Sequence, residues 1–257
     1  MSNNSALEGK HALITGGGHG IGGASAESLA AHGAKLTLTG RNMEKLEQMA
    51  ASLPGAEARE LDVTDENAVK RVFAEASASL GPVDILVNNS GIADTAPFLR
   101  TSSDMMRRLM EVNLIGTHTS TQQVLPAMID AGWGRIVNIS SLAGLSGQPY
   151  ITAYCASKHA VIGLTRTLAL EVVKKGITVN AVCPAYVETG MVDRGVENIQ
   201  KITGMSVDEA RAELAKKSPQ DRIIMPSEVG ATVAWLCLPG SESITGQSIA
   251  MAGGAWM

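Results

Sequence analysis

The stretch His11-Ala-Leu-Ile-Thr-Gly-Gly-Gly-His-Gly-Ile-Gly22 decides how this chain folds. Residues 11–15 read as a short strand, and the glycines that follow Thr15 form a tight turn opening onto a helix. This arrangement makes a phosphate cradle, because backbone N–H groups point outward and the helix dipole favours an anion. Glycine suits positions where the chain turns tightly and approaches a pyrophosphate closely. We therefore expect dinucleotide binding here, the alternative being a tight turn alone. The expected contacts are Gly16, Gly18, His19, Gly20 and Ile21.

Strand-like runs alternate with helical patterns along the rest of the chain. The alternation predicts an α/β fold, a single-domain Rossmann-type doubly wound parallel sheet over 1–257 with helices on both faces. Residues 188–222 break this rhythm around one expected helix, 207–216, and an insert of this length predicts a lid over the substrate. The expected strands are 11–15, 35–39, 58–62, 84–88, 135–139, 178–182 and 247–251. The other expected helices are 21–32, 43–53, 66–79, 103–130, 153–174 and 227–238.

Composition narrows the class of protein. The chain has 257 residues, 45% hydrophobic and 18% charged, with a net charge of −4. This net charge gives no basic surface for nucleic acid, so we expect no nucleic-acid partner. The sequence also has no block of Lys and Arg that would indicate binding to a membrane surface. The first ten residues lack the apolar stretch of a signal peptide, and Cys155, Cys183 and Cys237 show no metal-ligand spacing. We expect a soluble, cytoplasmic protein without a bound metal.

The type of dinucleotide depends on the end of the second strand, Thr39-Gly-Arg-Asn42. A site for NAD(H) usually has a carboxylate about 20 positions after the glycine turn, which binds the ribose 2′-hydroxyl. Here the first carboxylate is Glu44, whereas Arg41 would attract a 2′-phosphate and Gly40 would leave room for it. The sequence favours NADP(H), with NAD(H) possible. The alternative is that Arg41 is a solvated residue and Asn42 caps the next helix.

A second chemical pattern lies in the run Tyr154-Cys-Ala-Ser-Lys158. On a helix, a spacing of four residues places the phenol and the ammonium on one face. A phenol has an ordinary pKa of about 10, and a cation beside it lowers that pKa. Ser141, thirteen residues before Tyr154, could steady the oxygen that gains or loses the proton. The pattern predicts a tuned acid–base pair, although a solvated helix face has the same spacing.

Further motifs follow in a recognisable order. They are Thr-Gly-x-x-x-Gly-x-Gly at 15–22, Asp62-Val63, Asn88-Asn89-Ser90-Gly91, Asn113, Ser141, Tyr154-x-x-x-Lys158 and Pro184…Thr189. On these residues the chain resembles the short-chain dehydrogenases/reductases, from about Leu7 to Met257. Two positions depart from the family pattern: Ser90 replaces an alanine and Ala185 replaces a glycine. Neither change removes a catalytic group.

The resemblance implies a catalytic set of four residues. They are Asn113, Ser141, Tyr154 and Lys158. Asn113 would bind a water that relays protons from Lys158 to solvent, and Ser141 is preferred to Ser140 because its distance from the tyrosine matches the family. Tyr154 would protonate the alkoxide formed when a carbonyl accepts hydride, and Ser141 would hold that oxygen. The alternative for Asn113 is a tolerated polar residue within a helix.

The resemblance also implies cofactor contacts beyond the glycine turn. Asp62 and Val63 would contact the adenine, although Asp62 could instead be a turn residue. Asn89 would lie along a ribose, and Tyr154 and Lys158 would lie at the nicotinamide end. Carboxamide and phosphate contacts are implied at two more positions, Val187 and Thr189.

The substrate is the least constrained part. Residues 142–153, between Ser141 and Tyr154, carry no charge, whereas a small hydroxy acid normally needs an Arg or Lys partner. Similarity to fatty-acyl, hydroxybutyryl and polyketide ketoreductases favours a β-ketoacyl thioester or related ketone. Five lid cations could meet a CoA- or carrier-linked phosphate, or could be ordinary solvated charges. They are Arg194, Lys201, Arg211, Lys216 and Lys217.

We therefore expect an NADP(H)-dependent oxidoreductase that interconverts a ketone and a secondary alcohol. The alternatives are an NAD-dependent secondary-alcohol or hydroxysteroid-like dehydrogenase and a non-catalytic dinucleotide sensor. The sensor is disfavoured because the whole catalytic set is retained. The resemblance further implies a homotetramer assembled through 103–130, 153–174 and the apolar tail 251–257.

Overall fold

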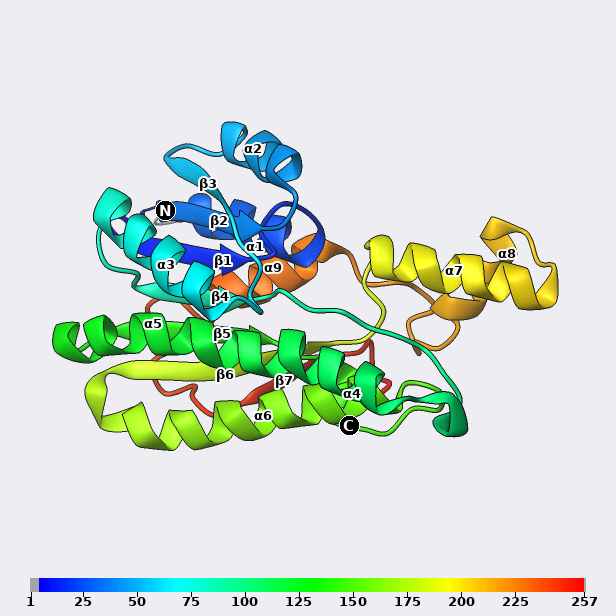
Figure 1. Cartoon of the computed structure of the whole chain (residues 1–257). Coiled ribbons are helices and arrows are strands. Elements are labelled where there is room, and N and C mark those ends of the chain that lie inside the picture. Colours follow the sequence, from blue (N-terminus) through cyan, green and yellow to red (C-terminus); the bar gives the residue numbers. More distant parts are fainter. Residues whose placement is uncertain (1–4, 257) are drawn as a thin grey trace.

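Seven parallel strands form one sheet within residues 5–256, the part of the chain that this computed structural model describes (Figure 1). The strand order is β3-β2-β1-β4-β5-β6-β7. The winding reverses between β1 and β4, where sheets of this kind bind ligands. The doubly wound parallel sheet is thus confirmed, while residues 1–4 and 257 of the expected domain lie outside the described part. The strands are β1 (His11–Thr15), β2 (Lys35–Gly40), β3 (Ala56–Glu60), β4 (Ile85–Asn88), β5 (Gly134–Ile139), β6 (Ile177–Pro184) and β7 (Ser248–Met251).

Helices cover both faces of the sheet, so successive residues of β1 are buried on opposite sides. Ile14 packs with Leu29 of α1 and Val233 of α9, whereas Leu13 packs with Phe73 of α3 and Val124 of α5. Both sides of the sheet are therefore core. The helices are α1 (Gly20–Ala30), α2 (Met43–Ala51), α3 (Glu66–Leu80), α4 (Ser103–Met110), α5 (Gly116–Ala131), α6 (Thr152–Val172), α7 (Gly190–Thr203), α8 (Val207–Ala215) and α9 (Pro226–Trp235).

Strand β3 ends two residues earlier than the expected strand 58–62. After Glu60, side-chain oxygens accept hydrogen bonds from backbone N–H groups in place of a neighbouring strand. Asp62 Oδ1 accepts the Thr64 N–H at 3.0 Å, and Asp65 Oδ1 accepts the Ala68 N–H at 3.0 Å as the cap of α3. The prediction was wrong at this end because these aspartates favour a turn over an extended chain.

The expected helix 103–130 is divided in the structure. Helix α4 ends at Met110, a π-helical turn spans Glu111–Ile115, and α5 begins at Gly116. A π-helical turn inside a helix frequently marks a functional position. Asn113 lies within this turn.

The lid segment, defined as residues 188–222, contains two helices instead of the one expected. Helix α7 was missed because its glycines read as breakers. Gly190 begins the helix, and Gly204 ends it with a φ of +75°. Gly195 lies inside it, where a Cβ would stand 3.7 Å from Leu214 of α8. These glycines therefore mark helix ends and a helix contact, and α7 and α8 extend beyond the sheet (Figure 1).

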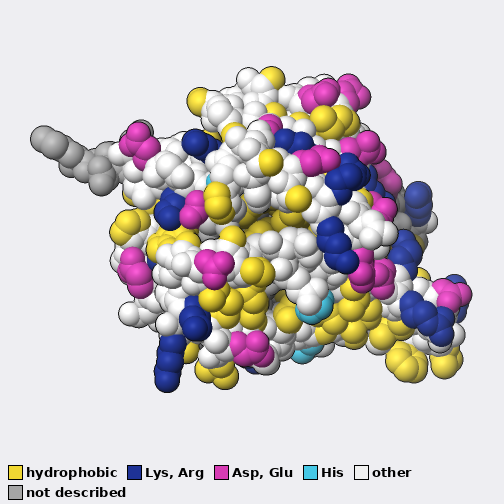
Figure 2. Space-filling model, turned by 60° about the vertical axis from the view of Figure 1, so that its left-hand side comes forward, with side chains coloured by type: hydrophobic (Ala, Val, Ile, Leu, Met, Phe, Trp, Pro, Cys, Tyr) yellow, Lys and Arg dark blue, Asp and Glu magenta, His cyan; other side chains and the backbone are white. Residues whose placement is uncertain are grey.

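The face drawn in Figure 2 carries Lys/Arg and Asp/Glu side chains interspersed, with apolar side chains gathered in patches between them. Neither sign of charge dominates this face. Among the helices of residues 5–256, none combines the length and apolar content that a membrane span requires.

Candidate active site

The glycine turn after β1 is held by Asn89, which follows β4. Its Nδ2 donates to the carbonyl oxygens of Thr15 at 3.0 Å and Gly16 at 2.9 Å. Gly16 and Gly20 adopt φ of +67° and +57°, which other residues adopt only with strain. A Cβ at Gly22 would stand 2.1 Å from the Gly16 oxygen. The structure thus brings together Asn89 and two glycines of the predicted set, Gly16 and Gly20, with Gly22 of the same turn packed against them.

The start of α1 is available to an anion. Its N-cap residue, His19, makes no side-chain capping bond, and the first turn of the helix carries no acidic residue. The first N–H groups of a helix have no intrahelical acceptor and favour negative charge. The start of α7 lies close by, because Thr189 Cγ2 is 3.2 Å from where a Cβ on Gly20 would be. The residues present therefore fit a dinucleotide pyrophosphate.

Arg41 is exposed just after β2. Asn42 caps α2 by accepting the Lys45 N–H at 3.0 Å, so this part of the alternative interpretation also holds. Lys45, which the sequence analysis did not select, lies near His19, and together with burial it lowers the pKa of that imidazole. The sequence could have indicated Lys45 through its position in the first turn of α2, the helix that follows Arg41. Arg41 and Lys45 make the edge of the cradle cationic.

A groove of about 550 Å³ opens between β3, α2 and α3, and Asp62 lies on its wall. Backbone and hydroxyl bonds from Thr64 lower the pKa of Asp62, with a smaller contribution from Arg41. Asp62 is therefore a turn residue, as the alternative held, and it still lines the groove. Val63 is buried against Gly116 of α5, where a Cβ would stand 2.8 Å from Val63 Cγ2.

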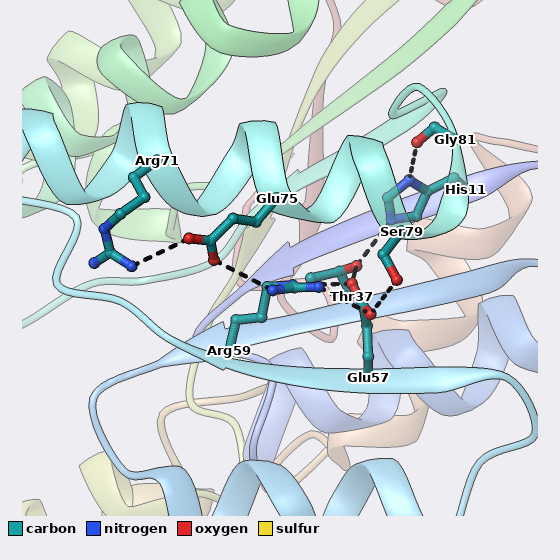
Figure 3. A network of polar contacts seen from close by, with 8 residues as sticks. All are labelled: His11, Thr37, Glu57, Arg59, Arg71, Glu75, Ser79 and Gly81. Carbon is teal, nitrogen blue, oxygen red and sulfur yellow. Dashed lines mark hydrogen bonds and ion pairs between the residues drawn. The ribbon is translucent and has the colours of Figure 1, made fainter.

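A chain of polar contacts runs along the far part of this groove (Figure 3). Arg59 bridges Glu57 at 3.0 Å and Glu75 at 3.3 Å, which ties the edge strand β3 to α3. Glu57 also accepts the Thr37 hydroxyl at 3.0 Å, and Thr37 in turn contacts the buried ring of His11 at 2.9 Å. These bonds fix the groove wall, and their charges are already paired.

Tyr154 and Lys158 lie one turn apart on α6, as predicted. Lys158 is 4% exposed, and its Nζ donates to the Ile139 oxygen at 2.8 Å. The Nζ lies 5.7 Å from the centre of the Tyr154 ring, and it is 3.4 Å from where a Cβ on Gly91 would be. The solvated-surface interpretation of this pair is therefore wrong, because the amine is inside the protein.

The pKa of Tyr154 departs from the sequence expectation. Burial raises the pKa of this phenol to about 12, opposed by a hydrogen bond with Ser141. Burial also lowers the pKa of Lys158 to about 8. The expected lowering of the tyrosine pKa by Lys158 is thus wrong for the protein alone, because desolvation is the largest contribution and the Lys158 ammonium is bonded to the Ile139 oxygen. At neutral pH, Tyr154 is a protonated acid.

The two neighbouring serines have different surroundings. Ser140 is buried and its hydroxyl donates to the Lys158 backbone oxygen at 3.1 Å. Ser141 is half-buried, accepts the Ala143 N–H at 3.1 Å and is the hydroxyl partner of Tyr154. The arrangement supports the choice of Ser141 over Ser140.

Asn113 is 1% exposed and is bonded through both ends of its amide. Its Oδ1 accepts the Ile92 N–H at 2.8 Å, and its Nδ2 donates to the Ile92 oxygen at 3.0 Å and to Ser157 Oγ at 2.9 Å. The residue therefore fastens the loop after β4 to α6, beside Tyr154 and Lys158. The water relay implied for Asn113 stays a prediction.

Three of the five lid cations point toward partners within the protein. Arg211 pairs with Glu188 and Asp193, and Lys216 pairs with Glu213. Lys217 Nζ donates to the Tyr186 hydroxyl at 3.3 Å. These pairs favour structural roles for the three residues over contact with a carrier phosphate.

The fold and site together define an α/β oxidoreductase that binds a dinucleotide. The sequence model of the short chain dehydrogenase family matches residues 10–200, and the chain belongs to that family. A 3-oxoacyl-(acyl-carrier-protein) reductase of Thermotoga maritima is 37% identical, covering 96% of this chain and 98% of the relative. A galactitol 2-dehydrogenase of Agrobacterium fabrum is 36% identical, covering 98% and 99%.

A solved structure has the same fold. It is the crystal structure of a variant actinorhodin polyketide ketoreductase with NADPH. The TM-score is 0.92 at 36% sequence identity, covering 96% of this chain and 97% of that one.

Proposed function

We propose that this protein is an NADPH-dependent ketoreductase that reduces a β-ketoacyl thioester or related ketone to a secondary alcohol. The observation that carries the proposal is the protonated, half-buried phenol of Tyr154 beside Ser141, on a fold whose glycine turn accepts a dinucleotide. Relatives named as a 3-oxoacyl-(acyl-carrier-protein) reductase and a polyketide ketoreductase support the same reaction class.

The cofactor would lie along the carboxyl ends of the central strands. The N–H groups at the start of α1 would bind the pyrophosphate, and Arg41 would bind the 2′-phosphate. When bound, the reduced nicotinamide supplies the hydride. The remaining proposed contacts are Asp62 and Val63 at the adenine, Asn89 and Lys158 at the riboses, and Val187 and Thr189 at the carboxamide and phosphate.

The protein's own residues donate the proton and replace it afterwards. Tyr154 Oη donates its proton to the alkoxide oxygen as that oxygen forms, while the Ser141 hydroxyl holds the same oxygen. The amine of Lys158 is close enough to stabilise the phenolate that remains, since Nζ lies 5.7 Å from the ring centre. Asn113 would hold the water through which the proton is replaced.

A substrate panel tests the proposal. Oxidation of NADPH and NADH is followed with acetoacetyl-CoA, simple ketones and ketosteroids, and reduction of NADP⁺ and NAD⁺ is followed with polyols. We expect turnover of acetoacetyl-CoA with NADPH. Turnover of simple ketones but not acetoacetyl-CoA would contradict the thioester substrate.

A second candidate is a polyol or other secondary-alcohol dehydrogenase. It is favoured by the galactitol 2-dehydrogenase relative, which is 36% identical over nearly the whole chain. In the same panel, polyol oxidation with NAD⁺ that exceeds every ketone reduction would select this candidate. Dinucleotide binding without turnover of any substrate would indicate a sensor.

We also propose a cytoplasmic homotetramer with residues 188–222 as the substrate lid. Apolar side chains exposed on α6 and near the C-terminus support assembly, with Leu170 78% exposed and Trp256 42% exposed. Light scattering on the eluting protein tests the oligomeric state, and a monomer would contradict it.

A further inference from the structure

The segment Tyr186–Thr189 links β6 to α7 and presents alternate side chains to different neighbours. Tyr186 packs against the apolar cluster between α7 and α8, which contains Val192 and Leu214. The carboxylate of Glu188 is bonded to Arg211 of α8. Thr189 is in contact with Gly20 of the glycine turn. The segment therefore contacts the lid helices through Tyr186 and Glu188 and the nucleotide cradle through Thr189.

The backbone of this segment is also held by Ile224, two residues beyond the lid segment. The Ile224 N–H donates to the Tyr186 oxygen at 2.9 Å, and the Glu188 N–H donates to the Ile224 oxygen at 2.9 Å. Val187, between them, is 5% exposed and packs in the main core. The segment is therefore a bend and turn held by one isolated β-bridge, Val187 to Ile224, with a fixed core residue between two side chains bonded to α8 and its C-terminal extension.

Arg211 makes the strongest of these connections. Its Nη1 donates to Glu188, before α7, and its Nη2 donates to Asp193, in the first turn of α7, at 2.5 Å. The bond with Glu188 raises the pKa of the guanidinium. A guanidinium binds two carboxylates at once through its fixed fork, whereas a lysine ammonium is a point charge. One side chain of α8 thus holds both the start of α7 and the residue before Thr189.

Thr189 completes the path to the cofactor site. It occupies the N-cap position of α7, but its hydroxyl donates to the Val187 oxygen at 3.1 Å and does not cap the helix. Its methyl group lies 3.2 Å from where a Cβ on Gly20 would be. A displacement of Glu188 would therefore move Thr189, which is one peptide away, against the glycine turn.

We propose that Arg211 is a positioning residue that couples the lid helices to dinucleotide binding through Glu188 and Thr189. The inference rests on the proposed NADPH site and goes beyond it, because it assigns a role to a residue far from the reacting atoms. With the Arg211–Glu188 bond made, Thr189 is held where α7 presents its free N–H groups beside those of α1. With the bond broken, α8 and the start of α7 separate and NADPH loses part of its site.

The test compares Arg211→Met and Glu188→Gln with the matched control Lys216→Met. Lys216 lies five residues further along, at the C-cap of α8, and pairs with Glu213. NADPH affinity is measured by its fluorescence on binding, and kcat is measured with a ketone at saturating NADPH. We expect each of the first two variants to weaken NADPH binding by up to about fivefold, because a partly exposed ion pair contributes at most about 1 kcal/mol. We expect kcat of Arg211→Met and Glu188→Gln to fall less than threefold, because the proton donor is unchanged. We expect the control Lys216→Met to match the wild type in both quantities.

Two further variants show whether the effect passes along this path. The double variant Arg211→Met/Glu188→Gln should bind NADPH no more weakly than Arg211→Met, since that single substitution already removes the bond to Glu188. Arg211→Lys should recover part of the affinity, because it restores the charge without the fork. If Arg211→Met does not fold, the NADPH affinity of the nearly isosteric Glu188→Gln tests the inference by itself.

Wild-type affinity in Glu188→Gln, or independent additive losses in the double variant, would overturn the inference. A loss of equal size in Lys216→Met would do the same, because it would show a general effect of lid charge. Failure of the proposed function looks different, since the wild-type protein itself would then not bind NADPH.

Discussion

The nucleotide cradle and the lid segment are built in opposite ways. The cradle is fixed by backbone conformation, with glycines at positive φ and the amide of Asn89 bonded to two carbonyl oxygens. The lid segment is fixed by side chains of α7 and α8, through a four-residue apolar cluster and exposed or half-exposed ion pairs. Such pairs each contribute at most about 1 kcal/mol when exposed. The cradle should therefore hold its shape, whereas the lid is the part that can move.

The largest effect should follow from removing the proposed acid, Tyr154 of α6. In Tyr154→Phe, ketone reduction should fall about 10²- to 10⁴-fold, because the proposed general acid is removed. NADPH binding should stay close to wild type, since the aromatic ring remains. Single-turnover kinetics with a fluorescence titration separate the two quantities. A variant that turns over like the wild type would remove Tyr154 from its proposed role.

A pair of glycine substitutions compares the two regions directly. Gly22→Ala should cost about 3 kcal/mol of unfolding free energy through overpacking, because the new Cβ would lie 2.1 Å from the Gly16 oxygen. Gly190→Ala, at the start of α7, should change it by less than about 0.5 kcal/mol, since nothing lies within 4 Å of its Cβ position. Urea denaturation measures both. Equal losses would mean that the lid is packed as tightly as the cradle.

A smaller effect concerns the pH dependence of stability. Burial lowers the pKa of Lys158 to about 8, so the unfolded chain binds more protons than the folded one between that pH and the ordinary lysine value. The stability of the wild type relative to Lys158→Met should thus rise as the pH rises from about 8 to about 10, by about 2 kcal/mol. Urea midpoints across this range test the sign. Parallel curves for the two proteins would contradict a buried amine.

The sequence predicted the nucleotide cradle better than the lid segment, because the cradle is fixed by local backbone conformation and the lid segment by contacts between distant side chains. Glycines that need positive φ are local signals, and they correctly located the turn between β1 and α1. In the lid the same residue type, at Gly190 and Gly195, marked a helix start and a helix contact, so α7 was missed. The partner of Arg211 is 23 residues away along the chain, and spacing alone does not identify it.

For the catalytic residues, the sequence predicted the positions along the chain but not the surroundings of each side chain. The four-residue spacing correctly placed Tyr154 and Lys158 on one face of α6. It did not predict the pKa direction of Tyr154, because burial depends on how α6 packs against β6 and the turn Leu142–Gly144. Nor did it show that the Asn113 amide would be bonded to Ile92 and Ser157 from a π-helical turn.

The central claim is that the cradle, ending at Arg41, makes this chain an NADPH reductase. The most direct measurement is the ratio of kcat/KM for NADPH to that for NADH, with acetoacetyl-CoA as substrate, in the wild type and in Arg41→Ala. We expect the wild type to prefer NADPH by at least about tenfold, and Arg41→Ala to lose most of that preference through a higher KM for NADPH. A preference for NADH that Arg41→Ala leaves unchanged would contradict the account.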